Sequence, residues 1–230
     1  MLLGEDGVAR LRAASVLVFG VGGVGAAAVE AFARAGIGTI GIVDHDTVSL
    51  SNINRQLIAL QSNVGEKKVT VAADRIREID PAIRVWTQDV FLSAQTVGQF
   101  DFAVYDFVVD AIDTVAAKVL LAQRCAQASV PLISSMGTGN KLDPAQLRID
   151  DVYETSGCPL ARVMRRELRK AGVESLPVVW SPEEPRKPLL EDPFAESRGK
   201  RAPGSVSFVP PVAGYLLAGY VIRKLTGVVP

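Results

Sequence analysis

The stretch Gly20-Val21-Gly22-Gly23-Val24-Gly25 decides the fold class of this chain. It follows Ala14–Phe19, whose apolar and β-branched residues predict a buried strand, and it leads into the small-residue segment Val24–Ala35, which predicts a helix. Glycines permit the tight turn and let a phosphate approach backbone N–H groups at the helix start. Gly36–Gly38 ends the helix, and Thr39–Val43 predicts a second strand. The sequence therefore predicts a βαβ unit.

Strands and helices continue to alternate beyond this unit. The apolar spacing of Lys68–Ile79 predicts a helix that Asp80 and Pro81 stop. The other expected elements are strands at Arg84–Thr87, Phe107–Ala111 and Val130–Ser135, and helices at Val115–Ala128, Leu160–Ala171 and Val212–Leu225. This alternation predicts a Rossmann-like, doubly wound α/β fold with a mostly parallel sheet, helices on both faces and an irregular C-terminal segment.

The chain is long enough for one large domain with a substantial core. It has 230 residues, of which 48% are hydrophobic. We expect a nucleotide-binding core over residues 1–150 and a substrate-facing C-terminal segment over 151–230. That segment includes a long, mobile loop over 181–204, which is rich in proline, glycine and charge.

Composition restricts the possible partners. The chain contains 25 Lys and Arg against 25 Asp and Glu, so its zero net charge gives no overall case for nucleic acid, although a local basic face could still provide one. We find neither a secretory signal nor an uninterrupted apolar run of membrane-spanning length, because the apolar run Val209–Ile222 contains proline, glycine and tyrosine. We expect a cytoplasmic protein without a membrane partner.

The two cysteines do not indicate a metal or redox site. No Cys-x-x-Cys motif occurs, which argues against structural zinc. Cys125 lies in an apolar run and is expected in the core, whereas Cys158 precedes Pro159 in a predicted loop and is expected to be exposed. Nothing nearby suggests an activating base, so an ordinary thiol is favoured over a catalytic one.

Polar residues follow the second predicted strand. Asp44 ends that strand about twenty residues after the glycines, where a ribose-binding acid belongs. The stretch Ser51-Asn52-Ile53-Asn54-Arg55-Gln56 then places an arginine, a glutamine and two asparagines in one short loop. The glycine turn and Asp44 alone favour a dinucleotide cofactor, and glycines used only for tight packing remain an alternative.

Charges farther along the chain weaken the dinucleotide interpretation. Lys68 starts a predicted helix and Asp113 lies at the C-terminal edge of a central strand. Because the carboxyl ends of parallel strands face one crevice, we expect Arg55, Lys68 and Asp113 to meet there. Two cations suit a triphosphate, and a carboxylate suits Mg²⁺. Any one of these charges alone is typical of a solvated loop residue, but their convergence favours phosphate chemistry over hydride transfer.

The motifs GVGGVG, IVDHDTVSLSNINRQ, VGEKKV and DAIDT occur in this order. They resemble the ThiF/MoeB/HesA superfamily of adenylating enzymes, and the resemblance covers Ala14 to about Asp150. It implies that the protein uses ATP and Mg²⁺ to join a carboxylate to AMP with loss of pyrophosphate. The implied catalytic residues are Arg55, Lys68 and Asp113, with Asp113 also holding the metal. The implied nucleotide-binding residues are Gly20, Gly22, Gly23, Gly25, Asp44, Asp46, Asn52, Arg55, Gln56 and Lys68.

Within this superfamily the chain is similar to the tRNA threonylcarbamoyladenosine dehydratase group, called TcdA or CsdL. The chain is short, lacks the paired Cys-x-x-Cys motif of the sulfur-carrier-activating branch, and carries CPLAR, RRELRKAG and GSVSFVPPVAG, which resemble that group's C-terminal third. The resemblance implies a homodimer that adenylates and cyclises threonylcarbamoyladenosine in tRNA. Two alternatives remain: adenylation of a ubiquitin-like sulfur-carrier protein, with a carrier or sulfur-transfer partner, and a non-catalytic or dinucleotide-binding Rossmann module.

The helix expected at Leu160–Ala171 is amphipathic. Its apolar face is expected to contain Leu160, Val163, Leu168 and Ala171. The opposite face carries five cations: Arg162, Arg165, Arg166, Arg169 and Lys170. Clustered Lys and Arg supply salt-sensitive phosphate binding, so this face is a candidate tRNA contact. An ordinary solvated helix face is the alternative.

The chain departs from its relatives in two places. Many superfamily members carry an arginine in an N-terminal extension that reaches ATP in the partner subunit. Here the first arginine is Arg10, so the resemblance does not supply that residue, and a truncated start is one explanation. Better-known relatives also have a cysteine in the C-terminal segment, where this chain reads Gly204-Ser205-Val206-Ser207-Phe208. We therefore expect no covalent thioester step.

Overall fold

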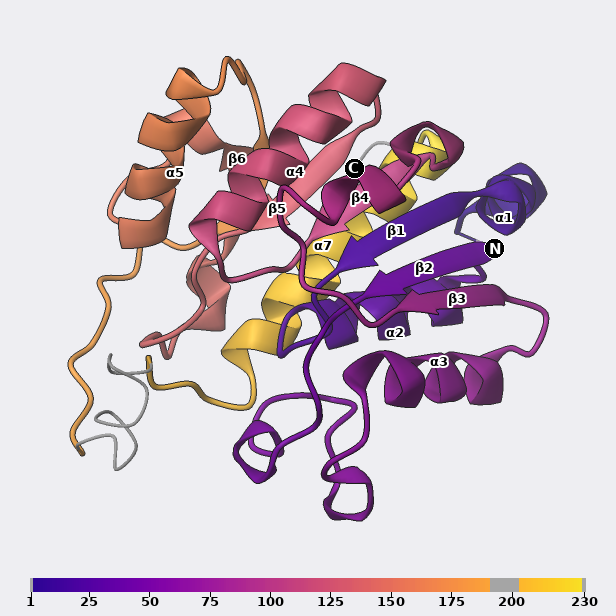
Figure 1. The fold of residues 1–230 in the computed structure, drawn as a ribbon, viewed down its shortest axis with the longest axis horizontal. Coiled ribbons are helices and arrows are strands. Elements are labelled where there is room, and N and C mark those ends of the chain that lie inside the picture. The colour runs from indigo at the N-terminus through magenta and orange to yellow at the C-terminus, as the bar shows by residue number, and fades with distance from the viewer. Residues whose placement is uncertain (1, 191–202, 229–230) are drawn as a thin grey trace.

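The computed structural model describes residues 2–190 and 203–228 and arranges them around a seven-stranded sheet (Figure 1). The strand order is β3-β2-β1-β4-β5-β7-β6. The strands are β1 (Ser15–Phe19), β2 (Thr39–Val43), β3 (Arg84–Gln88), β4 (Phe107–Asp110), β5 (Leu132–Ser135), β6 (Arg148–Asp151) and β7 (Pro177–Trp180). All neighbouring strands are parallel except β6 and β7, which pair antiparallel. Because the strand order reverses beside β1, a ligand crevice is expected at the carboxyl ends of β1 and β4.

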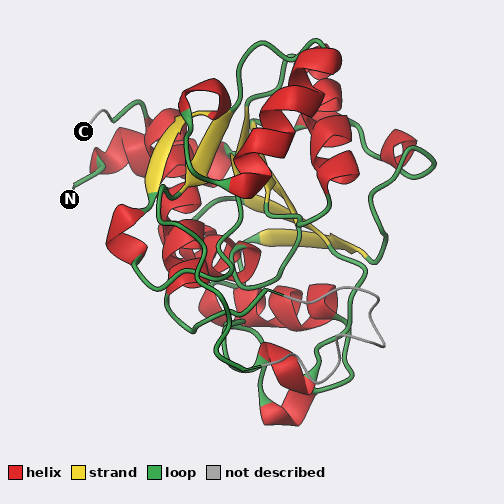
Figure 2. Cartoon of the chain, turned by 90° about the vertical axis from the view of Figure 1, so that its left-hand side faces the viewer, coloured by secondary structure: helices red, strands yellow, loops and turns green. Residues whose placement is uncertain are grey.

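Helices cover both faces of this sheet (Figure 2). They are α1 (Gly4–Ala13), α2 (Gly25–Ala35), α3 (Lys68–Ile79), α4 (Val115–Ala128), α5 (Pro159–Lys170) and α7 (Val209–Thr226). Along β1, Val16 and Val18 belong to the core shared with α2 and α7, whereas Leu17 and Phe19 belong to the core shared with α4 and α5. A strand buried on both faces needs apolar residues throughout, which explains the unbroken apolar run that predicts β1.

The predicted fold class is confirmed, and most expected elements lie within two residues of their predicted bounds. The strand expected from Val130 begins only at Leu132, because the Val130 N–H donates to the Cys125 carbonyl oxygen in the turn that caps the end of α4. The sequence did not predict α1, which buries only Gly7 and Leu11, or the two four-residue strands β6 and β7, although β7 is apolar. Within the C-terminal segment, β7 adds one strand to the sheet, and the described residues that follow it up to 190 contain no helix or strand.

Two C-terminal helices begin earlier than predicted. α7 starts at Val209 with prolines in its first turn, where a missing N–H costs nothing. α5 starts at Pro159 for the same reason. Its buried face also differs from the predicted one, because packing in the core shared with α4 selects that face. The fully buried residues of α5 are Ala161, Met164 and Leu168. Of these, only Leu168 belongs to the predicted apolar face, and the predicted Leu160, Val163 and Ala171 are all partly buried.

Both cysteines are buried. Cys125 is 1% exposed, as predicted. The expectation that Cys158 is exposed is wrong: the residue is 2% exposed, because it directly precedes α5 and packs into the core beneath that helix. The loop predicted over 181–204 lies partly outside the described residues, and its first ten residues contain no helix or strand. No described helix is both long and apolar enough to cross a membrane.

Candidate active site

A cavity of about 440 Å³ opens at the carboxyl ends of β1, β2, β4 and β5. Its size falls in the range of small-ligand sites. Arg55, Lys68 and Asp113 all line it, so the predicted convergence of these three charges is present. Every predicted nucleotide-binding residue except Gly25 also lines the cavity: Gly20, Gly22, Gly23, Asp44, Asp46, Asn52, Arg55, Gln56 and Lys68.

The glycines of the turn after β1 have two different uses. A Cβ atom on Gly25 would lie 1.8 Å from the Gly20 carbonyl oxygen, and one on Gly20 would lie 2.7 Å from the Ala111 carbonyl oxygen. Gly20 also has a positive φ of 87°, which favours glycine. These two glycines are required by packing. At Gly22 the nearest atom to an added Cβ is the Gln56 Nε2, 3.8 Å away, so that glycine keeps the cavity open.

The carboxylate of Asp44 joins the end of β2 to the glycine turn. Its Oδ2 accepts a hydrogen bond from the Val21 N–H at 2.7 Å, and its Oδ1 accepts one from the Asp46 N–H at 2.9 Å. Asp44 is only 9% exposed and lies on the cavity wall. The predicted ribose acid is therefore held rigidly, and each oxygen keeps further capacity to accept hydrogen bonds.

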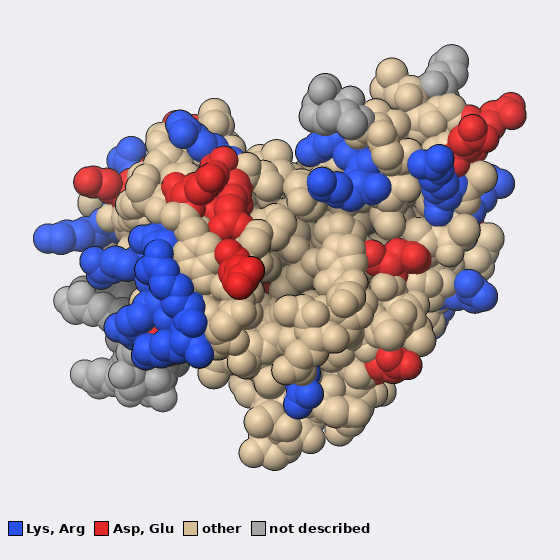
Figure 3. Space-filling model, turned by 90° about the horizontal axis from the view of Figure 1, so that it is seen from above, with Lys and Arg blue, Asp and Glu red and all other residues tan. Residues whose placement is uncertain are grey.

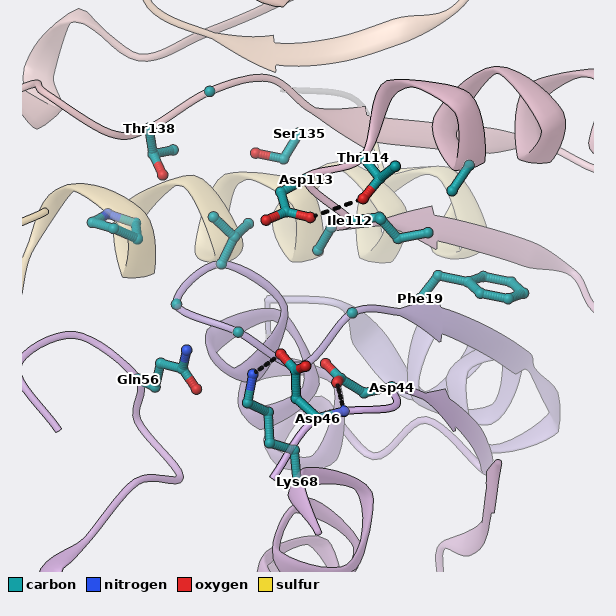
Figure 4. Close-up of a pocket in the computed structure, with 18 of the residues that line it drawn as sticks. Phe19, Asp44, Asp46, Gln56, Lys68, Ile112, Asp113, Thr114, Ser135 and Thr138 are labelled. Carbon is teal, nitrogen blue, oxygen red and sulfur yellow. Dashed lines mark hydrogen bonds and ion pairs between the residues drawn. The ribbon is translucent and has the colours of Figure 1, made fainter. Parts of the chain in front are cut away.

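Lys68 is held by Asp46 through both its side chain and its backbone. The Lys68 Nζ lies 2.6 Å from the Asp46 Oδ2, and the Lys68 N–H donates to the Asp46 carbonyl oxygen at 3.1 Å (Figure 4). Lys68 is 4% exposed. Ligand atoms of Asp44, His45 and Asp46 lie close enough together for a metal, but hydrogen bonds and this ion pair already engage both carboxylates.

The polar loop 51–56 contributes Asn52, Arg55 and Gln56 to the cavity wall. The Arg55 Nη1 donates to the Ser51 carbonyl oxygen at 2.8 Å and to the Asn54 Oδ1 at 2.9 Å. Asn52 is buried, and its Oδ1 accepts a hydrogen bond from the Ser49 N–H, which stabilises the first turn of the loop. These contacts give the Arg55 guanidinium a fixed starting position at the cavity wall.

Gln56 carries the clearest sign of a missing ligand. The residue is 6% exposed, and within the described part of the chain its Oε1 has no hydrogen-bond partner. A buried acceptor without a partner costs free energy, so such an atom usually meets a ligand or a water molecule. Gln56 lines the cavity opposite the Asp113 side (Figure 4).

The opposite wall of the cavity comes from the ends of β4 and β5 (Figure 4). It consists of Asp113, Thr114, Ser135 and Thr138. The Asp113 Oδ1 accepts a hydrogen bond from the Thr114 hydroxyl at 3.2 Å, and Asp113 forms no ion pair with any described residue. An exposed carboxylate that faces a phosphate-sized cavity fits Mg²⁺, which typically takes one or two carboxylates plus substrate phosphates.

One buried ion pair next to this wall was not predicted. The Lys118 Nζ lies 3.0 Å from the Asp110 Oδ2, and both side chains are fully buried. The sequence does contain a signal for it. Lys118 is three, four and seven residues before Leu121, Ala122 and Cys125, and therefore lies on the core face of α4. A lysine on a core face requires a buried partner.

Comparison with known proteins places the chain in a family. The profile of the ThiF family matches residues 1–230. The chain belongs to the ThiF family. The tRNA threonylcarbamoyladenosine dehydratase of Bacillus subtilis is 40% identical over 233 residues, which cover 98% of this chain and 92% of that protein. The E. coli tRNA N6-threonylcarbamoyladenosine dehydratase, TcdA, has the same fold in its complexes with AMP and ATP, with TM-scores of 0.89 and 0.88 at 33% and 34% identity. These matches cover 98% of this chain and 91% of TcdA.

A second kind of ThiF-like protein is similar over a shorter region. The adenylyltransferase and sulfurtransferase MOCS3 of Culex quinquefasciatus is 41% identical over 132 residues, which cover 57% of this chain and 30% of that protein. The resemblance to adenylating enzymes that the motifs suggested is thus confirmed at the level of the ThiF family. The individual roles of the cavity residues remain predictions.

The predicted basic face of this ThiF family member lies on α5. Lys and Arg side chains gather over this helix, at the left in Figure 3. Four of the five predicted cations are exposed: Arg162, Arg166, Arg169 and Lys170. Arg165 is partly buried and donates to the Thr155 carbonyl and hydroxyl oxygens, so the prediction that it lies on the solvent face is wrong.

Two of these cations share one acid. Glu167 pairs with Arg166 at 2.7 Å and with Lys170 at 3.1 Å. The hydrogen bond from Arg166, followed by that from Lys170, holds the pKa of Glu167 below its usual value. Arg10 lies elsewhere, on α1, where its Nη1 donates to the Thr226 carbonyl oxygen near the end of α7.

Proposed function

We propose that this ThiF family protein is an ATP-dependent tRNA threonylcarbamoyladenosine dehydratase. The observation that carries the proposal is the cavity, where Arg55, Lys68 and Asp113 meet the glycine turn at one edge of the sheet. The similarity to the Bacillus subtilis dehydratase over nearly all of both chains supports the choice of substrate. The similarity to TcdA structures that contain ATP or AMP supports the choice of nucleotide.

The reaction divides into two steps. First, a carboxylate oxygen of the threonylcarbamoyl group attacks the α-phosphorus of ATP; the P–O bond to the β-phosphate breaks and pyrophosphate leaves. A second group of the same substrate then attacks the acyl carbon, the ring closes and AMP leaves with the former carboxylate oxygen. The net change is loss of water from the substrate and hydrolysis of ATP to AMP and pyrophosphate. The second step needs no enzyme nucleophile, so the burial of both cysteines does not conflict with it.

The residues of the cavity walls have different roles in the proposed reaction. Gly22 leaves room for the phosphates, and Asp44 accepts hydrogen bonds from the ribose. Arg55 and Lys68 neutralise charge that develops on the phosphates during attack. Asp113 would hold Mg²⁺, which supplies further neutralisation of the triphosphate. The Gln56 Oε1, which lacks a partner among the described residues, accepts a hydrogen bond from the bound substrates.

The exposed cations of α5 are our candidate for the tRNA-binding surface. Phosphate contacts from Arg162, Arg166, Arg169 and Lys170 would orient the anticodon region toward the cavity. Leu160, in the first turn of α5, lines the cavity, so the basic helix and the reaction site adjoin. An RNA held by this helix can therefore present a single base to the cavity.

The test uses purified protein, ATP with Mg²⁺, and tRNA that carries threonylcarbamoyladenosine. We expect AMP and pyrophosphate to form in step with the cyclised base, and neither to form with the same tRNA transcribed without modifications. Nucleoside analysis by mass spectrometry follows the base, and chromatography follows AMP. Ring closure at the same rate without ATP would refute the proposal.

A second candidate is activation of a ubiquitin-like sulfur-carrier protein. The observation in its favour is the similarity to MOCS3, which is limited to 57% of this chain. This reaction uses the same adenylation site and differs in its partner, a protein tail that ends in Gly-Gly or an associated sulfur-transfer protein. Pyrophosphate exchange that depends on such a carrier, and not on modified tRNA, would select this candidate over the dehydratase.

We further propose that residues 1–230 act as one adenylation domain, that the active form is a cytoplasmic homodimer, and that it contains no structural zinc. The domain proposal is supported by the sheet, because β7 comes from the C-terminal segment and lies between β5 and β6, which come from the preceding part of the chain. The homodimer and the location follow from the family resemblance and from a tRNA substrate. Light scattering coupled to size-exclusion chromatography tests the dimer, and elemental analysis of the purified protein tests the absence of zinc.

A further inference from the structure

Asp110 and Lys118 form a fully bonded ionic network beneath the cavity. The Lys118 Nζ donates to the Asp110 Oδ2 at 3.0 Å, to the Ser134 hydroxyl at 3.0 Å and to the Ser135 carbonyl oxygen at 2.8 Å. The Ser134 hydroxyl in turn donates to the Asp110 Oδ2 at 2.6 Å. Three ammonium protons and three acceptors are thus matched, and Asp110, Lys118 and Ser134 are 0% exposed.

The network joins the two strands that supply the Asp113 side of the cavity. Asp110 is the last residue of β4 and is the cross-strand partner of Ser134 on β5. Lys118 comes from α4 and reaches the carbonyl of Ser135, the last residue of β5. One ammonium group therefore fixes the ends of β4 and β5 relative to each other.

The network also sets the start of the loop that carries Asp113. The second oxygen of Asp110, Oδ1, accepts a hydrogen bond from the Ile112 N–H at 3.0 Å. The same loop is held from the other side, because the Ala111 N–H donates to the Phe19 carbonyl oxygen at 2.8 Å and an added Cβ on Gly20 would collide with the Ala111 carbonyl. Ile112 and Asp113 themselves line the cavity. A shift of Asp110 would therefore move Asp113.

Stability alone does not explain this arrangement. A fully buried ion pair pays a large desolvation penalty, and apolar residues of similar volume often replace such pairs without loss of stability. A charged pair on the core face of α4, which it shares with the buried Leu121 and Ala122, is therefore more easily explained by the geometry that it imposes. Buried polar networks with every group satisfied hold their members in one arrangement.

We propose that Asp110, Lys118 and Ser134 are positioning residues that fix Asp113, after β4, relative to Ser135 and Thr138, which end and follow β5 on the same wall of the cavity. The proposal rests on the proposed function, which puts the phosphates and Mg²⁺ between Asp113 and the glycine turn. The acyl group of the substrate then lies along the Ser135 and Thr138 side. The network acts on the reaction only through these cavity residues and touches neither substrate.

The test compares Lys118→Met, Asp110→Asn, the double variant and Ser134→Ala. Lys118→Met leaves a buried carboxylate without its cation and is expected to lose much stability. The double variant removes both charges, so its thermal unfolding midpoint should return toward that of the unmodified protein. Ser134→Ala removes one hydroxyl and serves as a mild variant that folds. The matched control is Glu30→Gln, which disrupts another buried carboxylate, paired with Arg34 and Arg75 away from the cavity.

A positioning role predicts that activity does not follow stability. In the double variant we expect kcat for AMP formation to stay lower by on the order of 10- to 100-fold, because small misplacements of reacting groups cost that much. The Mg²⁺ concentration for half-maximal rate should rise, whereas the KM for ATP should change by less than about twofold. Ser134→Ala should show the same pattern in weaker form, and Glu30→Gln should lose stability without losing kcat.

Two results would overturn the positioning role. One is a double variant whose kcat recovers together with its unfolding midpoint, and the other is a Glu30→Gln variant that loses kcat to the same extent. Failure of the proposed function gives a different result, since the unmodified protein would then form no AMP with the modified tRNA. Calorimetric titration with Mg²⁺ and a non-hydrolysable ATP analogue would still report the Mg²⁺ dependence of the variants in that case.

Discussion

The ammonium group of Lys68 lies 2.6 Å from the carboxylate of Asp46, and the backbone N–H of Lys68 donates to the carbonyl of the same residue. The pair joins the first residue of α3 to the loop after β2, across 22 positions of the chain. Lys68 is nearly inaccessible to solvent, while half of the Asp46 side chain is exposed. The lysine therefore has a preset direction before any nucleotide arrives.

Removing the carboxylate of Asp46 should weaken ATP binding without unfolding the protein. In Asp46→Asn the Lys68 N–H keeps its hydrogen bond to the carbonyl of residue 46, but the Lys68 ammonium loses its charged partner, so it must be ordered again when phosphate binds. We expect the KM for ATP to rise by about three- to tenfold, with a smaller effect on kcat. Steady-state kinetics of AMP formation measure both values. The exposed pair Arg77 and Asp74 offers the control Asp74→Asn, which should change neither.

Arg55→Ala should abolish AMP formation and leave the fold intact. Two hydrogen bonds tie the guanidinium to its own loop, through the Ser51 carbonyl and the Asn54 side chain, so its removal disturbs an exposed segment rather than the core. Loss of a donor that stabilises transition-state charge costs on the order of 10²- to 10³-fold in kcat. Circular dichroism checks the fold, and Arg77→Ala is the matched surface control. Normal activity in Arg55→Ala would mean that this loop has no part in catalysis.

Asp113→Asn should change the metal requirement more than the nucleotide affinity. The neutral amide is a poorer ligand for Mg²⁺ than the carboxylate, and Asp113 accepts a hydrogen bond from Thr114 but pairs with no cation among the described residues. We expect the Mg²⁺ concentration for half-maximal activity to rise by about tenfold or more. Titration of activity with Mg²⁺ at saturating ATP gives this value. An unchanged Mg²⁺ dependence would show that the metal is held by other groups.

The glycine turn, the polar loop and the DAIDT motif could be placed from the sequence because each follows a strand with a strong apolar pattern. A parallel sheet then brings strand ends together whatever the details of packing. The same logic places Asp110 at a strand end and Lys118 on a core face, but it could not predict that these residues pair with each other and with Ser134, because that pairing depends on the register between β4 and β5. That register pairs Asp110 with Ser134, and no single-strand pattern encodes it.

The C-terminal third was harder to predict for a related reason. The periodicity of α5 predicts a helix, but its buried face is set by packing against the core shared with α4, which includes the small residue Ala161 that an apolar pattern does not single out. The wrong expectation for Cys158 also comes from the start of this helix. A residue before a proline is typical of an exposed loop, but here Cys158 is the residue that precedes α5, and it is buried in the core. β7 contains only four residues and depends on β5 and β6 for its hydrogen bonds.

Substitution of three exposed cations on α5 should weaken tRNA binding in a salt-dependent manner. Each phosphate-binding cation that is removed reduces the slope of the logarithm of the binding constant against the logarithm of the salt concentration by about one. We expect the triple alanine variant at Arg162, Arg166 and Lys170 to bind tRNA roughly tenfold or more weakly at moderate salt, with an unchanged KM for ATP. Filter binding over a salt series measures the slope. A slope identical to that of the unmodified protein would show that this face of α5 makes no contact with the tRNA phosphates.

Neither cysteine should react with thiol reagents while the protein is folded. Both side chains are at most 2% exposed, and burial raises the pKa of Cys125 to about 12, so almost no thiolate is present near neutral pH. We expect labelling by a disulfide reagent only at the rate of unfolding, and then at both positions at once. Rapid labelling of Cys158 alone would show that the start of α5 opens locally.

The helix α7 packs against the glycine turn after β1, although the two lie almost at opposite ends of the sequence. Pro210 of α7 lines the cavity, and an added Cβ on Gly214 would lie 2.2 Å from the carbonyl oxygen of Val24, so the helix touches the start of α2. A nascent chain whose α7 is still inside the ribosome lacks this wall. The cavity is therefore complete only after the last helix of the chain has emerged, and a fragment that stops before α7 lacks part of its wall.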